Sequence, residues 1–198
     1  MSVAAVILAG GDSRRMGQDK ALLPMGQQTL LEHVAQRVQQ VCQTLWLSRQ
    51  PHQPVPAPLT SLTQLHDSDL QQGPLAGIAA ALNYALQQKS VQGLLVVPVD
   101  LPFVDTEVLT TLCQQGDTVQ RPVCFGRHYM PLYLPVKPAI CDFIHAQLNR
   151  HDSRKSVASV FFEFNGVQLP EPKGQSLTNT NTLSEWESAR SHWETLHG

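Results

Sequence analysis

The strongest constraint on the fold is a short apolar segment near the N-terminus that ends at a pair of glycines. Residues 3–9 read Val-Ala-Ala-Val-Ile-Leu-Ala, without a polar side chain, and Gly10 and Gly11 follow directly. A half-buried strand alternates apolar and polar residues, whereas a continuous apolar run of this length is typical of a strand covered on both faces. The segment therefore predicts a strand inside a parallel sheet.

Further along the chain, segments with the period of strands alternate with segments that have the period of helices. The predicted strands cover residues 44–48, 62–66 and 93–99, and the predicted helices cover 29–42, 75–88 and 105–114. Strands that alternate with helices form parallel sheets with helices on both faces. We therefore expect an α/β fold, with a three-layer, doubly wound, mostly parallel sheet whose ligands bind at the carboxyl ends of the strands.

The rest of the chain is predicted to add a small hairpin insertion and more helices. The hairpin joins residues 122–125 and 129–134 around Gly126; helices cover 138–148, 154–162 and 183–196, and a strand covers 164–169. Thr182 and Glu185 form a capping box for the last helix. A length of 198 residues fits one domain, which we expect to span residues 1–198.

Charge and composition argue against several classes of protein. The formal net charge is −2, whereas a general nucleic-acid binder carries a strong basic excess. No apolar run approaches the roughly 20 residues of a membrane helix, and the first residues lack the basic start of a signal peptide. The four cysteines are far apart and form no C-x-x-C motif, which indicates reduced thiols. We expect a cytoplasmic protein with neither a nucleic-acid partner nor a membrane association.

The loop after the first strand is the first candidate for chemistry. It contains Gly10, Gly11, Arg14, Arg15 and Lys20. Glycines let backbone N–H groups approach an anion, and the three cations suit the outer groups of a polyphosphate. The spacing fits neither the Rossmann fingerprint nor the Walker A loop. The alternative interpretation is a glycine turn followed by an exposed basic loop.

A second candidate lies at the end of the strand predicted over residues 93–99. Asp100 follows this apolar segment and stands between Pro98 and Pro102. Mg²⁺ binds to one or two carboxylates together with substrate phosphates, so a carboxylate at this point indicates a metal site. The alternative is that Asp100 caps the next helix, although Asp105 and Thr106 are better placed for that cap.

Two further segments carry weaker signals. Gly73 and Pro74 form a rigid turn before a helix that starts with small residues, against which a flat ring or a ribose can lie. Residues 178–182 read Thr-Asn-Thr-Asn-Thr, and their amides can reach a substrate. Taken alone, the first segment is better explained by a well-packed junction between a loop and a helix, and ordinary turn and cap chemistry is the more common explanation of the second.

Together, these four segments resemble the molybdenum cofactor guanylyltransferases. The resemblance rests on Leu8-Ala9-Gly10-Gly11-x-Ser13-x-Arg15-Met16-Gly17-x-Asp19-Lys20, Gly73-Pro74-Leu75-Ala76-Gly77, Asp100-Leu101-Pro102 and Asn179-x-Asn181-Thr182, and it extends from residue 3 to about 190. It implies a Rossmann-like nucleotidyltransferase fold and transfer of GMP from GTP to the phosphate of molybdopterin, with release of pyrophosphate. The implied metal is Mg²⁺, with Mn²⁺ as a substitute. The implied partners are GTP, molybdopterin and the molybdoenzyme apoproteins or their chaperones.

The resemblance also implies roles for individual residues, with a nucleotide-binding half over about 1–105 and an acceptor-binding half over about 106–198. Catalysis falls to Asp100, Lys20 and Arg15, and the metal to Asp100. Nucleotide binding falls to Leu8, Ala9, Gly10, Gly11, Lys20, Asp67 and Asp100, with Ser48, Gly73, Pro74, Leu75 and Gly77 as further candidates. Asn179 and Asn181 are candidates for the acceptor side. Many family members have Asn where this chain has Ser48, which donates one hydrogen bond instead of two.

A basic cluster outside these motifs is a separate hypothesis. Arg154 and Lys155 lie close to Arg150 and His151 and would receive the phosphate of the acceptor. The alternative is a solvated helix start.

Other functions remain open at this stage. One is cytidylyl transfer to the same pterin, or nucleotidyl transfer to a sugar phosphate, because the sequence does not reveal which base edge the site pairs with. Another is a non-catalytic carrier that binds GTP, but the presence of both Asp100 and Lys20 argues against it, since binding alone needs no metal carboxylate.

Overall fold

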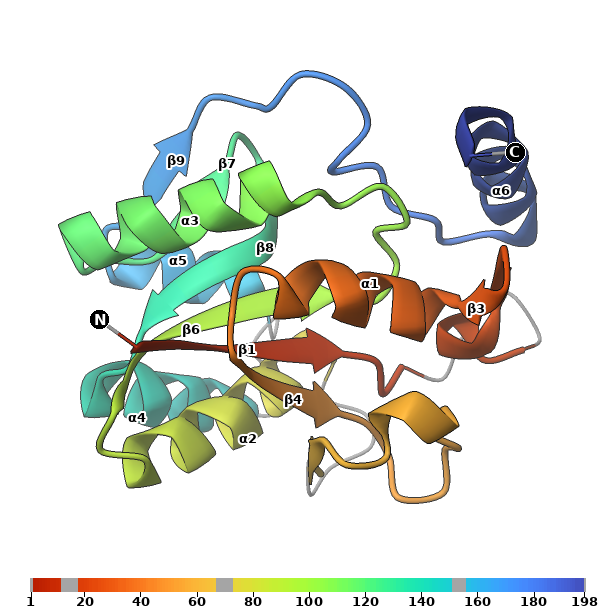
Figure 1. Ribbon diagram of the computed structural model, residues 1–198. Coiled ribbons are helices and arrows are strands. Elements are labelled where there is room, and N and C mark those ends of the chain that lie inside the picture. Colours follow the sequence, from red (N-terminus) through yellow and green to blue (C-terminus); the bar gives the residue numbers. More distant parts are fainter. Residues whose placement is uncertain (1, 12–17, 67–72, 151–155, 198) are drawn as a thin grey trace.

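The computed structural model describes residues 2–11, 18–66, 73–150 and 156–197. Its centre is a seven-stranded sheet with the order β5-β4-β1-β6-β8-β7-β9 (Figure 1). The strands are β1 (Ser2–Leu8), β4 (Thr44–Ser48), β5 (Thr63–Leu65), β6 (Val91–Pro98), β7 (Val123–Phe125), β8 (His128–Pro135) and β9 (Val167–Leu169). β1 pairs in parallel with both β4 and β6. The mostly parallel sheet predicted from the sequence is therefore confirmed.

Helices cover both faces of the sheet. One face carries α1 (Leu30–Gln39) and α3 (Thr106–Val119), and the other carries α2 (Pro74–Gln87), α4 (Pro138–Leu148) and α5 (Val157–Glu163). Alternate residues of β1 enter the two resulting cores: Ala5 and Ile7 face α1, while Ala4 and Val6 face α2. All four are fully buried, which confirms the prediction of a strand covered on both faces.

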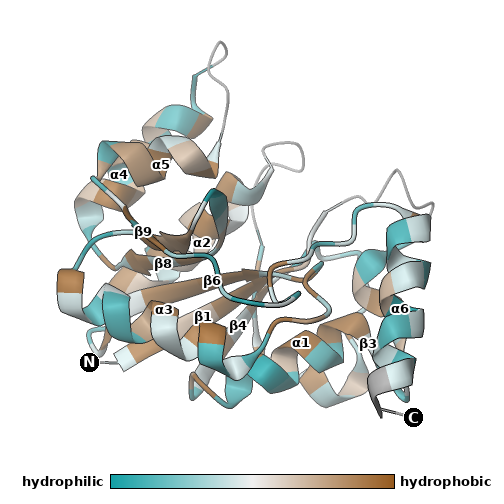
Figure 2. Cartoon of the chain, turned by 90° about the horizontal axis from the view of Figure 1, so that it is seen from above, coloured by the Kyte–Doolittle hydropathy of each residue, from teal (hydrophilic) through white to brown (hydrophobic). Residues whose placement is uncertain are grey.

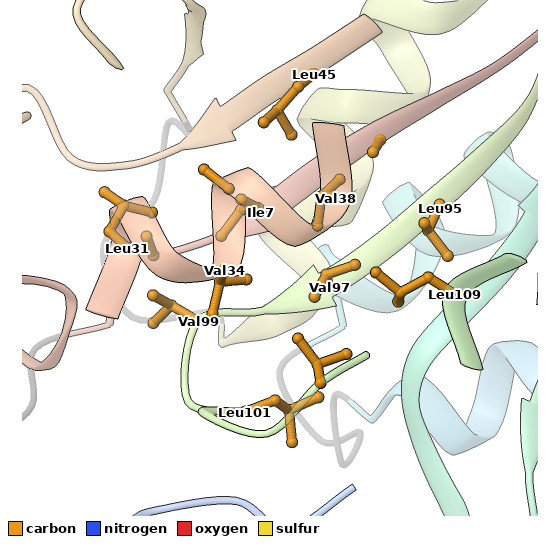
Figure 3. Close-up of a cluster of buried hydrophobic side chains, with 14 of the residues drawn as sticks. Ile7, Leu31, Val34, Val38, Leu45, Leu95, Val97, Val99, Leu101 and Leu109 are labelled. Carbon is orange, nitrogen blue, oxygen red and sulfur yellow. The ribbon is translucent and has the colours of Figure 1, made fainter. Parts of the chain in front are cut away.

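Hydropathy follows this layered arrangement. The strands of the sheet are hydrophobic, and the surrounding helices carry hydrophilic residues on their outer sides (Figure 2). In the core on the α1 side, Ile7 lies among Leu31, Val34 and Val38 of α1 and Val97 of β6 (Figure 3). No helix in the described part of the chain combines the length and the apolar composition needed to span a bilayer.

The helices begin at the polar residues that the sequence predicts. The Asp105 carboxylate accepts a hydrogen bond from the Val108 N–H at 2.8 Å and so caps α3. The predicted capping box at α6 (Leu183–His197) is confirmed, since the Glu185 N–H donates to Thr182 Oγ1 at 3.2 Å and Glu185 Oε2 accepts from the Thr182 N–H at 2.8 Å. α2 follows Gly73, whose φ of 66° lies in the left-handed region that favours glycine.

Several boundaries differ from the prediction. α1 ends at Gln39 instead of residue 42, and α3 continues past Gly116 to Val119 instead of ending near residue 114. Gly116 lies directly against the Tyr133 ring of β8, and a Cβ atom there would be 2.1 Å from Tyr133 Cδ1. Tertiary packing therefore favours helix at a residue with a low intrinsic helix propensity.

Short elements also appear where the sequence predicts loops. They are the 3₁₀ turns η1 (Lys20–Leu22) and η2 (Ala57–Leu59) and the two-stranded hairpin of β2 (Pro24–Met25) and β3 (Gln28–Thr29). Elements of two or three residues are too short to show a hydrophobic period.

The hairpin around Gly126 belongs to the main sheet. β8 pairs antiparallel with β6, with Gly93 opposite Pro135 and Val96 opposite Leu132. β7 and β9 then extend the sheet beyond β8. The second half of the chain therefore continues the sheet of the first half.

Candidate active site

A cavity of about 740 Å³ opens at the carboxyl ends of β1, β4 and β6. Most of the sequence-predicted site residues within the described ranges line it: Leu8, Ala9, Gly10, Gly11, Lys20, Ser48, Gly73, Pro74, Gly77, Asp100 and Asn179. Leu75 does not, because its side chain is fully buried in the core beneath α2. Arg15, Asp67, Arg154 and Lys155 lie outside the described residues.

The floor of the cavity is the end of β1, held on both sides by its neighbours. The Ala9 N–H donates to the Ser48 carbonyl at 2.9 Å, and the Val99 N–H donates to the Leu8 carbonyl at 3.1 Å. Neither Gly10 nor Gly11 has a left-handed φ. A Cβ at Gly10 would lie 3.5 Å from Arg49 Cα, whereas a Cβ at Gly11 would meet no atom of the described residues within 4 Å. Gly11 therefore leaves its backbone uncovered beside the cavity.

Ser48 and Gly77 form a tight contact beside this floor. A Cβ at Gly77 would lie 2.5 Å from Ser48 Oγ and 2.9 Å from Leu8 Cδ2, so a larger residue there would force these side chains to move. Glycine at position 77 thus lets α2 start close to the end of β4, and Ser48, which is buried, lines the cavity between them. The sequence points to this glycine, but only the structure identifies its neighbour.

Lys20 and Asp100 meet in the cavity from segments 80 residues apart in the sequence. Lys20 Nζ lies 3.6 Å from Asp100 Oδ2 and donates a hydrogen bond to Asn181 Oδ1 at 2.9 Å. Burial raises the pKa of the Asp100 carboxyl above its ordinary value, and the positive charge of Lys20 opposes that shift. Asp100 is therefore a carboxylate that one ammonium group does not fully compensate, so a further cation beside it is favourable.

The segment before α6 is anchored across the end of β6. The buried Thr180 donates its N–H to the Asp100 carbonyl at 3.0 Å, and Ser176 Oγ donates to the Asp105 carboxylate. These bonds place Asn179 at the cavity and Asn181 on Lys20. The Thr-Asn repeat thus does more than cap a helix, because it connects the C-terminal part of the chain to Asp100 and Lys20.

Sequence reasoning missed the opposite wall of the cavity, which comes from the start of β8. His128, Tyr129 and Met130 line it. The Tyr129 ring packs edge-on against Phe161, with ring centroids 5.5 Å apart, and against Phe162 at 5.9 Å. The sequence signal that could have pointed to this wall is the run His128-Tyr129-Met130 soon after the turn at Gly126. It does not alternate polar and apolar residues, as a strand with one face in solvent would.

Sequence reasoning also missed Arg49, and it gave no role to Asp19, which belongs to the glycine-rich signature; the two residues contact each other beside the end of β1. Arg49 is almost fully buried, and its guanidinium donates to an oxygen of the Asp19 carboxylate at 2.5 Å. An arginine just after a strand has no distinguishing pattern, because most such residues are exposed.

The side chains present fit a metal that is shared with a substrate. Within the described ranges, no group of three or more His, Cys, Asp or Glu side chains is arranged to hold an ion alone. Asp100 offers one partly buried carboxylate to the cavity. One carboxylate together with phosphate oxygens is a usual ligand set for Mg²⁺.

Known proteins resemble this chain over most of its length. Residues 5–163 match the model of the MobA-like NTP transferase domain. A probable molybdenum cofactor guanylyltransferase from Mycobacterium avium is 31% identical over 192 residues, which is 93% of each chain. A protein of the same description from Synechococcus elongatus is 31% identical and covers 95% of this chain and 98% of its own.

Solved structures share the fold. Molybdopterin-guanine dinucleotide biosynthesis protein A from Archaeoglobus fulgidus superposes with a TM-score of 0.77 at 20% identity, covering 97% of this chain and 99% of its own. The 2-C-methyl-D-erythritol 4-phosphate cytidylyltransferase from Thermus thermophilus superposes with a TM-score of 0.70 at 15% identity, covering 98% of this chain and 100% of its own. At these identities the likeness shows the fold alone.

Proposed function

This chain belongs to the MobA-like NTP transferase family, and from that membership we propose that it transfers GMP from GTP to the phosphate of molybdopterin. The products are molybdopterin guanine dinucleotide and pyrophosphate. Relatives described as molybdenum cofactor guanylyltransferases match it over nearly their whole length, which supports this choice of substrates.

The main observation behind the proposal is that Lys20 and Asp100 meet in one cavity. They lie there with Ala9, Gly10 and Gly11, the segment after β1 that we call the glycine edge. Lys20 Nζ and Asp100 Oδ2 are 3.6 Å apart, and Gly10 and Gly11 line the same cavity. A triphosphate needs uncovered backbone and a cation on one side, and a metal ligand on the other. The arrangement supports binding of GTP with its phosphates against Gly10, Gly11 and the Lys20–Asp100 pair.

The chemistry requires little from the side chains beyond charge and position. The attacking group is a phosphate oxygen that is already ionised at pH 7, so no general base is needed. The obstacle is repulsion between two anions, and Lys20 offsets that repulsion where the pyrophosphate leaves. In-line placement of the acceptor against the α-phosphate supplies the remaining acceleration.

We propose that Asp100 holds Mg²⁺, with Mn²⁺ as a substitute. Its carboxylate is partly buried and pairs with Lys20, which fits a ligand that shares a divalent ion with phosphates. When bound, the ion supplies positive charge to the reacting phosphates.

The acceptor enters, in this proposal, along the wall formed by β8. Tyr129 and Asn179 both line the cavity, and Tyr129 supplies an aromatic ring. A flat pterin ring suits such a wall, while its phosphate reaches toward Asp100. Asn181 contributes indirectly through its hydrogen bond from Lys20. Roles for Arg15 and Asp67 at the nucleotide, and for Arg154 and Lys155 at the acceptor, stay proposals from the sequence.

The proposal also covers the cellular location of the protein and the proteins that receive its product. All four cysteines are free thiols, which supports a cytoplasmic location. Molybdoenzyme apoproteins or their chaperones would then receive the finished dinucleotide.

Release of pyrophosphate by the purified protein tests the proposed function. The protein is incubated with Mg²⁺, molybdopterin and each of GTP, ATP, CTP and UTP in turn, with acceptor-free reactions as the control. We expect release that needs the acceptor and is fastest with GTP. Faster release with CTP would indicate a cytidylyltransferase, and GTP binding without any release would indicate a carrier.

A further inference from the structure

A buried arginine lies directly behind the cavity wall. Arg49 follows β4 and is 1% exposed. Its guanidinium donates three hydrogen bonds: from Nε to the Pro54 carbonyl at 2.9 Å, from Nη1 to the Ala9 carbonyl at 2.9 Å, and from Nη2 to Asp19 Oδ2 at 2.5 Å. Buried charges are uncommon and persist when they are paired and hydrogen-bonded, as this one is.

Two of these bonds reach the two segments that we propose to bind the phosphates, the glycine edge and the turn that carries Lys20. Ala9 belongs to the glycine edge at the end of β1. Asp19 begins the turn η1, and its second oxygen accepts the Ala21 N–H at 3.0 Å, so the carboxylate caps the turn that carries Lys20. Arg49 therefore connects the glycine edge to the turn of Lys20 through one rigid, planar group.

The backbone of Arg49 is itself fixed. Its N–H donates to the Leu65 carbonyl at 3.2 Å, and its carbonyl accepts from His66 Nδ1 at 2.8 Å. The guanidinium thus projects from a strand end that is held on both sides. Any displacement of Arg49 would move the glycine edge and the Lys20 turn relative to each other.

The ion pair also changes the charge of the cavity. Asp19 lines the cavity beside Lys20, and its carboxylate would repel the phosphates of a nucleotide. Arg49 compensates this charge from behind the wall, where its own side chain has no contact with solvent. Lys20 is then left to act on the phosphates and on Asp100.

We propose that Arg49 is a positioning residue for nucleotide binding and transfer. It sets the orientation of Lys20 by holding Asp19, and it neutralises Asp19, without touching the nucleotide. The inference rests on the proposed function for the identity of the ligand, a nucleoside triphosphate, and it assigns a role to a residue outside every sequence motif described above.

A double-mutant cycle distinguishes this role from a purely structural one. The variants are Arg49→Met, Lys20→Ala and the double variant, and the readouts are the GTP dissociation constant and kcat. If Arg49 acts through Lys20, Arg49→Met lowers kcat by about 10- to 100-fold in the parent protein, since small misplacements have effects of that size. It then changes kcat by less than about threefold when Lys20 is already absent. Equal effects of Arg49→Met on kcat in both backgrounds would overturn the inference. Part of its effect on GTP affinity is expected to persist without Lys20, because the uncompensated Asp19 carboxylate still repels the phosphates.

Arg49→Lys adds a graded comparison. Lysine keeps the charge but cannot donate to Pro54, Ala9 and Asp19 at once in a fixed fork. We expect it to restore part of the GTP affinity that Arg49→Met loses. Lysine behaving no better than methionine in both readouts would contradict the part of the inference that concerns charge.

A matched control separates loss of stability from loss of position. Tyr133 is fully buried and donates to Asp117 Oδ1 at 3.1 Å, away from the cavity. Tyr133→Phe is expected to lower the unfolding temperature with kcat unchanged. If Arg49→Met does not fold, Asp19→Asn breaks the same ion pair at its partly exposed partner, and the same cycle with Lys20→Ala applies. Unchanged kcat in Asp19→Asn would overturn the inference; its GTP affinity reflects two opposing effects, since the variant also removes the carboxylate that repels the phosphates.

The double-mutant cycle measured by the GTP dissociation constant does not require that the protein transfers GMP. A parent protein that binds GTP through Lys20 but releases no pyrophosphate would contradict the proposed function and leave the role of Arg49 measurable. A parent protein whose GTP affinity is unaffected by Lys20→Ala would contradict the role of Arg49 directly, even if transfer occurs.

Discussion

At the scale of single residues, Asp100 shows a conflict between function and stability, because the charge that its proposed function needs is disfavoured by burial. Burial raises the pKa of its carboxyl, so the folded protein binds a proton there more readily than the unfolded chain does. The resulting contribution to stability is present below the ordinary pKa of 3.8 and is lost as pH rises through the higher pKa of the folded state. The ionised carboxylate needed for function is thus the less stable form without a bound cation.

Asp100→Asn is therefore expected to abolish transfer and to change how stability depends on pH. We expect a loss of turnover of roughly 1,000-fold or more, because a metal ligand supports several kcal/mol of transition-state stabilisation. Without divalent metal, urea unfolding should show the variant gaining stability relative to the parent as pH rises from about 4 to 7. A difference that is constant across this range would contradict the raised pKa of the Asp100 carboxyl.

Lys20→Ala tests the other member of the pair. We expect the GTP dissociation constant to rise by about 10- to 100-fold, because a charge-assisted hydrogen bond to phosphate contributes roughly 1.5–3 kcal/mol. Lys89 provides the control, since it is exposed and follows the end of α2 that is remote from Gly73. Isothermal titration should show unchanged affinity in Lys89→Ala, and equal affinities in the two variants would count against the phosphate site.

The residues that sequence reasoning found and those it missed differ in one respect. Lys20 and Asp100 stand out because glycines or prolines surround them and mark the end of a buried strand. Arg49 and Tyr129 have no such surroundings, and their importance comes from contacts with distant segments. A short sequence motif reveals a functional residue when its neighbours in sequence belong to the same site. It does not reveal a residue whose contacts in the site come from distant parts of the chain.

At the scale of elements, β8 changes how the second half of the chain is understood. From sequence it reads as one arm of a local hairpin, since β7 and β8 are close together and turn at Gly126. In the structure β8 also pairs with β6, which brings Tyr129 to the cavity. Pairing between strands that are about 40 residues apart leaves no mark in either strand alone.

Truncation of Tyr129 should affect the acceptor and spare the nucleotide. We expect Tyr129→Ala to raise the KM for molybdopterin by about 10-fold, as one ring contact contributes on the order of 1 kcal/mol or more, and Tyr129→Phe to have little effect. The KM for GTP should stay within about twofold in both, because the glycine edge and Lys20 are unchanged.

Tyr84 is the matched control for that prediction. It packs edge-on against Trp46, with ring centroids 5.0 Å apart, but lies outside the residues that line the cavity. Tyr84→Ala should lower the unfolding temperature without changing either KM. An unchanged KM for molybdopterin in Tyr129→Ala would place the acceptor elsewhere.

At the scale of the whole molecule, one sheet connects the segments proposed for the nucleotide and for the acceptor. The alternation of strands and helices predicts β5, β4, β1 and β6 as a parallel group, and the structure confirms it. The order of β8, β7 and β9 depends on long-range pairing, which the sequence pattern does not specify. Because β6 pairs with both β1 and β8, the two halves share backbone hydrogen bonds through the centre of the fold.

We therefore propose that the chain unfolds as one cooperative domain, and that GTP with Mg²⁺ stabilises all of it. At a GTP concentration 100 times the dissociation constant, binding adds about 2.7 kcal/mol to the free energy of unfolding. For a protein of this size that corresponds to a rise of roughly 5–10 °C in the unfolding temperature. Calorimetry should show a single transition that moves as a whole.

The same experiment with Lys20→Ala and Asp100→Asn locates the source of this stabilisation. Both variants remove a charged group from the cavity and leave the pairing of β6 with β1 and β8 intact, so each should keep a single transition. At the same GTP concentration the rise in unfolding temperature should shrink, because weaker binding transfers less free energy to the folded state. Two transitions in the parent protein, only one of which moves with GTP, would show that the halves unfold separately despite the shared sheet.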